Sequence, residues 1–122
     1  MAVAFEAVRR LALSLDHVEE SKSYGTQAFK VRGVLIARLH QDLDALVVRT
    51  DFEQRAELMA VDAETYFITD HYLNYEWVLV SLARVHPDAL RDLLRMAHRL
   101  AAAEKPKTTK KKSLARRPRA KR

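Results

Sequence analysis

The chain has 122 residues, of which 48% are hydrophobic, so its composition predicts one globular domain with a hydrophobic core. It holds no cysteine, which excludes disulfides, thiolate nucleophiles and cysteine-bound metal. Its net charge of +6 is unevenly spread, because residues 105–122 hold ten Lys and Arg and no acid, whereas residues 1–104 hold 12 Lys and Arg against 16 Asp and Glu. We therefore expect an acidic domain over residues 1–103, and a disordered, Lys/Arg-rich tail over residues 104–122.

The N-terminal residues predict a helix over residues 2–15, because apolar side chains recur there at helical spacing. Glu6, Arg9 and Arg10 lie within this apolar pattern, which is typical of an amphipathic helix and not of a signal peptide. The sequence has no run of about 18 apolar residues, the length that a membrane helix needs. We expect a cytoplasmic protein without a membrane span.

A hairpin follows a polar link over residues 16–23. Two β-rich runs, over residues 26–31 and 34–40, are separated by a two-residue loop that ends in glycine, which is typical of a hairpin. Both glycines of the chain lie in this part, where the backbone must turn sharply.

The two-residue loop also predicts a register for the hairpin. It pairs Val31 with Val34 and Phe29 with Ile36, so that these four side chains share the face that packs on the core. We expect the hairpin to be the centre of a small antiparallel sheet.

The middle of the chain predicts a strand and a helix. A polar turn over residues 41–44 leads into a third strand over residues 46–49, rich in β-branched side chains. Two overlapping capping-box patterns, at residues 50–53 and 51–54, predict a second helix that ends near Ala60.

The remaining residues predict two further strands and a last helix. A short strand over residues 66–68 precedes a polar and aromatic loop over residues 70–76. Residues 77–85 are apolar on both faces, which places this strand in the middle of the sheet. Pro87 suits the first turn of a helix that runs to about Ala103.

The order of elements is helix, three strands, helix, two strands and helix. This order predicts an α+β fold, in which N-terminal, middle and C-terminal helices cover an antiparallel sheet of about five strands. The short loops exclude parallel crossovers between the first three strands.

Several blocks of the sequence together resemble a known family. The runs SYGTQAFKVRG, LIARL, LVVRTD and YFITDHYLNYEWVLVSLARV, with their order and spacing, are similar to those of the MmcQ/YjbR-like family over about residues 4–102. The resemblance implies a small cytoplasmic α+β bacterial protein that binds DNA through a double-wing-like sheet. Two departures are visible, because Gln27 and Glu76 stand where the family usually has proline.

The sequence shows no catalytic motif. Its serines lie in no nucleophile elbow, its five histidines have no metal-ligand spacing, and its two separate glycines make no phosphate loop. We therefore expect a protein that is not an enzyme and that has no cofactor and no metal.

Basic side chains are the candidates for nucleic-acid binding, and the resemblance implies that the nucleic acid is DNA. Lys30 falls on the face opposite Phe29, Arg32 at the hairpin tip, and Arg38 on the Phe29 face beside Gln27. Arg49 and Arg84 are candidates as well, and the sequence leaves the face of Arg49 open. The alternative is that these cations are ordinary solvated charges, several of them paired with acids. The tail gains affinity for any polyanion by releasing its counterions, unless it serves only solubility. The candidate residues are Lys30, Arg32, Arg38, Arg49, Lys110, Lys111, Lys112, Arg116, Arg117 and Arg119.

A second group of residues suggests a pocket beside the sheet. Its members carry hydroxyl, imidazole or aromatic groups near turns, where they either meet a ligand or pack on the sheet and bond to nearby backbone. They are Tyr24, Thr26, His71, Tyr72 and Trp77. The alternative function is therefore a small-ligand or protein-interaction module. The sequence leaves the oligomeric state open.

Overall fold

The computed structural model describes residues 3–23 and 25–103. The predicted tail, residues 104–122, lies outside the described residues. In chain order the elements are α1 (Phe5–Leu13), β1 (Val18–Ser23), β2 (Thr26–Val31), β3 (Val34–Leu39), β4 (Ala45–Arg49), α2 (Phe52–Val61), β5 (Tyr66–Phe67), the 3₁₀ turn η1 (Asp70–Tyr72), β6 (Trp77–Ser81) and α3 (Pro87–Ala102).

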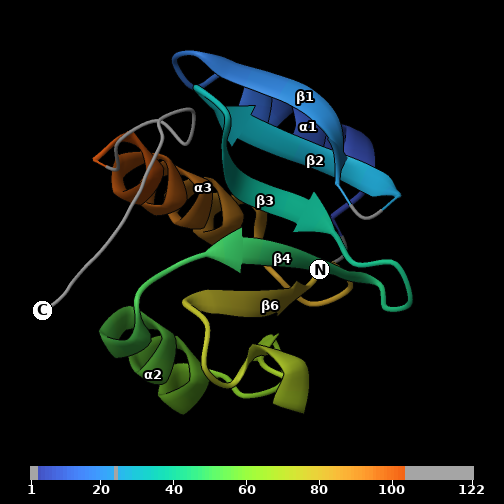
Figure 1. The fold of residues 1–122 in the computed structure, drawn as a ribbon. Helices are drawn as coiled ribbons and strands as arrows, with labels where there is room; N and C mark the ends of the chain where they lie inside the picture. The colour runs from blue at the N-terminus through green and yellow to red at the C-terminus, as the bar shows by residue number, and fades with distance from the viewer. Residues whose placement is uncertain (1–2, 24, 104–122) are drawn as a thin grey trace, which may run out of the picture.

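The strands form one antiparallel sheet in the order β1-β2-β3-β4-β6-β5. Helices α1 and α3 lie together behind the sheet, and α2 lies beside its β6 end (Figure 1). The main core fills the space between the sheet and the two helices that cover it, α1 and α3. This architecture confirms the α+β fold with an antiparallel sheet.

Strand β1 shows that the prediction of a polar link over residues 16–23 was wrong, and it raises the number of strands to six. The sequence of β1 did not predict a strand because its exposed acidic side chains break the apolar pattern, and such charged side chains are typical of edge strands. Arg9 of α1 holds it in place: Nε and Nη2 donate to the two carboxylate oxygens of Glu20, at 2.8 and 3.1 Å. This bidentate pair attaches the polar edge strand to the helix behind it.

A β-bulge in the hairpin decides which side chains reach each face. Val31 pairs with Val34 as predicted, but Phe29 pairs with Ala37 and not with Ile36, because the register shifts between Phe29 and Lys30. Ile36 and Ala37 consequently both belong to the main core.

The bulge turns the next residue of β3 to the other face of the sheet. Arg38 pairs with Ala28 of β2 and Val47 of β4, and so lies opposite the main core. The prediction that Arg38 shares the Phe29 face was therefore wrong, since a shift of one residue reverses every later side chain.

The helices begin close to where the sequence predicts. The second of the two capping patterns is the one used, since the Asp51 carboxylate accepts from the Gln54 N–H at 2.7 Å. Pro87 occupies the first turn of α3 as predicted, and the His86 side chain accepts from the Asp88 N–H. Strand β6 ends at Ser81, earlier than predicted, because the chain turns at residues 82–84.

The face of the sheet opposite α1 and α3 carries a much smaller apolar cluster. Its buried members are Ala45, Val47, Tyr72 and Leu79, with partly buried side chains packed around them. Tyr72 comes from the loop that joins β5 to β6, so this loop and not a helix covers that cluster. We call this side of the sheet the open face.

The hairpin turn carries backbone strain that a substitution can relieve. Arg32 and Gly33 have φ values of 51° and 84°, as a tight two-residue hairpin turn requires. The side chain of arginine is sterically strained in this left-handed region, and asparagine is less strained there. We expect Arg32→Asn to raise the free energy of unfolding by about 1 kcal/mol, measured by urea denaturation.

The matched control for this prediction is Arg32→Ala, which removes the charge but leaves a similar backbone penalty. It is expected to change the free energy of unfolding by less than about 0.5 kcal/mol. Equal stabilisation by both substitutions would show that the charge of Arg32, and not its backbone, sets the effect.

Candidate functional site

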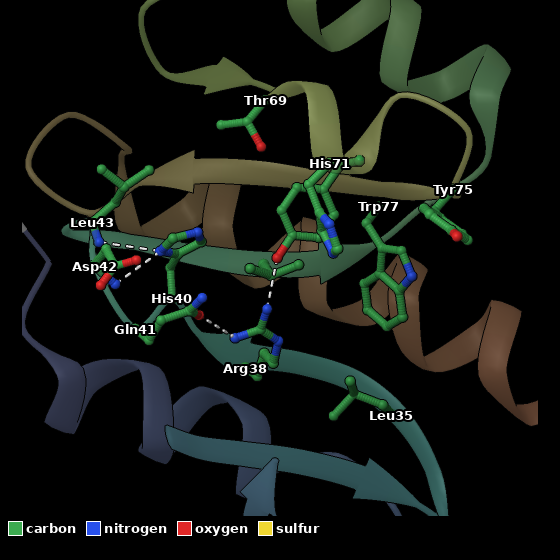
Figure 2. Close-up of a pocket in the computed structure, with 12 residues that line it drawn as sticks. Leu35, Arg38, His40, Gln41, Asp42, Leu43, Thr69, His71, Tyr75 and Trp77 are labelled. Atoms are coloured by element: carbon green, nitrogen blue, oxygen red, sulfur yellow. Dashed lines mark hydrogen bonds between the residues drawn. The ribbon is translucent and has the colours of Figure 1, made fainter. Parts of the chain in front are cut away.

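A pocket lies on the open face, between β3, β4, β6 and the loop after β5. Its volume is about 720 Å³, within the range of small-molecule binding sites. In Figure 2, Arg38 lies between Trp77 and Leu35 on one side and His40 and Leu43 on the other. The pocket therefore combines aromatic and aliphatic walls with hydrogen-bonding groups.

Arg38 supplies a fixed positive charge to this pocket. The residue is 5% exposed, and its Nη1 donates to Gln41 Oε1 at 3.0 Å and to the Leu39 carbonyl at 3.3 Å. Its Nη2 donates to the Tyr72 hydroxyl at 2.6 Å. Because a guanidinium stays protonated at physiological pH, the charge is permanent and these bonds hold its orientation.

His40 adds a neutral donor next to that charge. Its Nδ1 accepts from the backbone N–H groups of Asp42 and Leu43, at 3.0 and 3.1 Å, so the neutral ring carries its proton on Nε2. Burial lowers the pKa of His40 below its ordinary value, and the Arg38 charge lowers that pKa further. At neutral pH the imidazole therefore offers an Nε2–H donor without a charge.

Aromatic rings make up a large part of the pocket wall. The His71 ring stands edge-on to the Tyr72 ring, with 4.8 Å between their centroids, and lies 6.2 Å from that of Tyr75. Trp77 is half-buried at the start of β6, directly opposite Arg49 of β4. Rings of this kind offer flat surfaces on which a planar group can stack.

The loop that carries these rings is held by one arginine from α2. Arg55 is 8% exposed, and its Nη1 donates to three backbone carbonyls, those of Tyr72, Tyr75 and Trp77, at 3.0, 2.7 and 3.2 Å. Its Nη2 donates to the Leu73 carbonyl at 3.0 Å. Three carbonyls of the loop and that of the first residue of β6 thus converge on a single cation, which fixes the loop over the open face.

Three of the predicted basic residues share the open face with the pocket. Lys30 pairs with Leu35, a pocket residue, and follows Ala28 by two positions, so it lies on the same face as Arg38. Arg49 follows Val47 by two positions and lies there too. Arg32 is exposed at the hairpin tip, as predicted.

The remaining candidates divide into three groups. Arg84 pairs with Glu64, and the Thr26 hydroxyl donates to the Ser23 carbonyl at 3.0 Å, so both have the local partners that the alternative interpretation expects. His71, Tyr72 and Trp77 line the pocket together. Tyr24 lies outside the described residues, as do the tail candidates Lys110, Lys111, Lys112, Arg116, Arg117 and Arg119.

Sequence reasoning missed three residues that shape the site. Arg55 lies in the second predicted helix, for which the sequence suggested no site residue, although it shares one helical face with Phe52 and Met59, and a cation on such a face signals a buried hydrogen-bonding partner. His40 and Gln41 were assigned to a strand end and a polar turn. Their closeness to Arg38 in the sequence was the only signal that they could join it.

The comparisons with known proteins agree with this fold. A family model described as YjbR matches residues 13–100. The chain belongs to the YjbR family. This confirms the resemblance that the sequence blocks indicated.

A solved structure supports the fold of this YjbR chain. It is the crystal structure of the Deinococcus radiodurans protein DR2400, with the domain DUF419, and it matches at a TM-score of 0.70 and 24% sequence identity. The match covers 88% of this chain and 83% of the other. At this identity the similarity concerns the fold alone. No curated protein matches the chain.

Two further searches concern the described part of this YjbR chain. Within residues 3–23 and 25–103, no three His, Asp or Glu side chains gather in a way that would hold a metal ion. Among the helices of the same residues, none has the length and apolar character needed to cross a membrane.

The Arg55 hydrogen bonds generate a stability prediction for this YjbR domain. Arg55→Met keeps an unbranched apolar side chain but removes every side-chain donor, so four carbonyls lose the Arg55 hydrogen bond, although those of Tyr72 and Tyr75 still accept from backbone N–H groups. We expect the free energy of unfolding to fall by about 3 kcal/mol, measured by urea denaturation. Trp77 fluorescence, which reports on the end of the loop, is expected to change in the native state as well.

The control is Arg84→Met, which breaks an ion pair whose two side chains are 52% and 74% exposed. Such a pair contributes about 1 kcal/mol at most. If Arg55→Met cost no more than Arg84→Met, the loop would not depend on Arg55.

The lowered pKa of His40 generates a prediction of pH dependence. Below the ordinary value of 6.5, the unfolded chain binds a proton at His40 that the folded domain excludes, so stability falls as the pH falls. NMR titration is expected to give a pKa below 6.5 and a ring protonated on Nε2 at neutral pH.

His40→Asn is expected to reduce the loss of melting temperature between pH 7.5 and pH 5, because asparagine can accept the same backbone N–H groups without titrating there. The matched control is His86→Asn, which replaces a mostly exposed imidazole whose Nδ1 also accepts from backbone. A normal or raised pKa for His40 would contradict the prediction.

Proposed function

We propose that this protein binds nucleic acid, and DNA in particular, without catalysing a reaction. The basic tail gives phosphate affinity that is independent of sequence, and the open face of the first hairpin orients the domain. The observation that carries the proposal is the position of Lys30, Arg38 and Arg49 on one face of the sheet that neither α1 nor α3 covers. DNA binding is also what the family resemblance implies.

The charge distribution supports a division of roles between domain and tail. Residues 1–104 carry a net charge of −4, so the domain as a whole does not attract a polyanion, whereas residues 105–122 carry ten cations. A local group of cations on an acidic domain can orient a phosphate backbone, but it supplies little long-range attraction. We therefore assign the affinity for nucleic acid to the tail, and the orientation of the domain on the nucleic acid to the open face.

We assign no reaction to the pocket. Its lining includes no serine, lysine or cysteine that would act as a nucleophile. The Tyr72 hydroxyl is engaged by Arg38, and His40 is oriented by backbone donors on its Nδ1. These contacts support a role in binding.

The pocket itself favours a second candidate function, a small-ligand module. A concave site with aromatic walls and a few oriented polar groups is the usual form of a ligand site. The buried Arg38 and the Nε2–H of His40 favour a planar ligand with negative charge or several acceptors.

A salt series tests the nucleic-acid proposal. We expect the full chain to bind duplex DNA with an affinity that falls steeply as salt rises, because each phosphate contact adds about 0.9 to the log–log slope. A chain that ends at Ala103 keeps every described helix and strand, and is expected to lose most of the affinity. Lys30→Gln with Arg49→Gln is expected to lower the slope by about 2 if both side chains contact phosphates.

The matched control is Arg10→Gln with Arg95→Gln, which likewise removes two cations, both of them exposed, but from α1 and α3, on the far side of the sheet. It is expected to leave the slope near that of the unchanged chain. Absence of salt-dependent binding by the full chain would exclude the proposal, and equal effects of the two double substitutions would exclude the role of the open face.

A further inference from the structure

The pocket and the open-face cations adjoin one another on the sheet. Trp77, in the pocket wall, is the direct cross-strand partner of Arg49, and Leu35, also in the wall, is that of Lys30. A phosphate chain that follows the cations therefore passes the mouth of a pocket lined by rings. A base in a double helix cannot enter such a pocket, because it is stacked between its neighbours and its edge is paired with the other strand.

The groups inside the pocket complement a single unstacked base. Trp77, Tyr75 and His71 supply ring surfaces, and base–aromatic stacking tolerates every base because each has a π-face. On the polar side stand the Nε2–H of His40 and, beside it, the charge of Arg38, both held in place by hydrogen bonds. A donor next to a positive charge matches the oxygen and nitrogen acceptors that an unpaired base exposes along its edge.

We propose that the pocket receives one unpaired base of a single-stranded nucleic acid, while Lys30 and Arg49 contact the flanking phosphates. This inference rests on the proposed function, because it takes the open face as the nucleic-acid surface. It adds that the folded domain distinguishes single strands from duplexes, which the cationic tail does not do. The pocket supplies the discrimination between single strands and duplexes, and the positive charge of the tail supplies the general affinity for nucleic acid.

The chain contains a direct reporter for this proposal. Trp77 is its one tryptophan and lines the pocket, so a base that stacks there changes the intrinsic fluorescence of the protein. We would titrate the full chain with a short oligothymidylate and with a mixed-sequence duplex of the same length, at one salt concentration. The single strand is expected to quench Trp77, and the duplex is expected to bind without quenching it.

Tyr75→Ala tests the pocket with little risk to the fold. The Tyr75 side chain is 57% exposed, and Arg55 binds the backbone carbonyl at this position, which the substitution retains. Loss of one stacking ring is expected to weaken single-strand binding roughly five- to a hundredfold, while duplex binding stays the same. Leu73→Ala is the matched control, since Leu73 lies in the same loop, is also 57% exposed and does not line the pocket.

The outcomes separate this inference from the proposed function. If both nucleic acids bind equally, without quenching and without an effect of Tyr75→Ala, the pocket proposal is overturned while nucleic-acid binding stands. If neither binds, the proposed function itself fails. If thymidine monophosphate quenches Trp77 as well as the oligomer does at equal nucleotide concentration, the pocket is a site for free nucleotides, and the single-strand proposal is overturned.

Discussion

The hydrogen bonds of Arg55 are the interaction on which the open face depends. One guanidinium from α2 donates to three carbonyls of the loop between β5 and β6 and to that of Trp77 at the start of β6, and charge-assisted bonds of this kind are about twice as strong as neutral ones. The loop has little regular structure of its own beyond the short turn η1. With Arg55 in place, its rings stand at fixed positions over β4 and β6, and a pocket exists between loop and sheet.

A second constraint, the β-bulge, puts charge into that pocket. Without the extra residue in β3, Arg38 would point toward the main core, where a guanidinium would lose its hydration among apolar side chains. With it, the guanidinium meets the Tyr72 hydroxyl and Gln41 on the other face. The two buried arginines therefore have different roles. Arg55 holds the loop that forms one wall of the pocket, and Arg38 supplies the positive charge inside the pocket.

Patterns of apolar residues predicted most of the fold but not these polar details. Helix α3 and the hairpin were predictable, because their spacing has a clear period and their ends carry Pro87 and Gly33. Strand β1 was not, because an edge strand needs few apolar residues and is held by Arg9. The bulge and the Arg55 bonds depend on contacts between distant segments, which no local pattern contains. The sequence predicted a group formed by His71, Tyr72 and Trp77, because aromatic side chains cluster in that loop. His40 was not predicted, because its place in the pocket depends on how the turn after β3 folds.

The charge of the chain sets how strongly such a pocket must bind. A single base in an aromatic site is held weakly when free in solution, and an acidic domain does not attract it from a distance. A cationic segment joined to the same domain changes this, because a strand bound to it is present at the pocket at a high effective concentration. Weak stacking and two or three phosphate contacts are then enough to select single strands. Under the proposed function, affinity and discrimination are therefore separate: the ten cations of residues 105–122 would supply the affinity, and an otherwise acidic domain would supply the discrimination with Lys30, Arg38 and Arg49 on its open face.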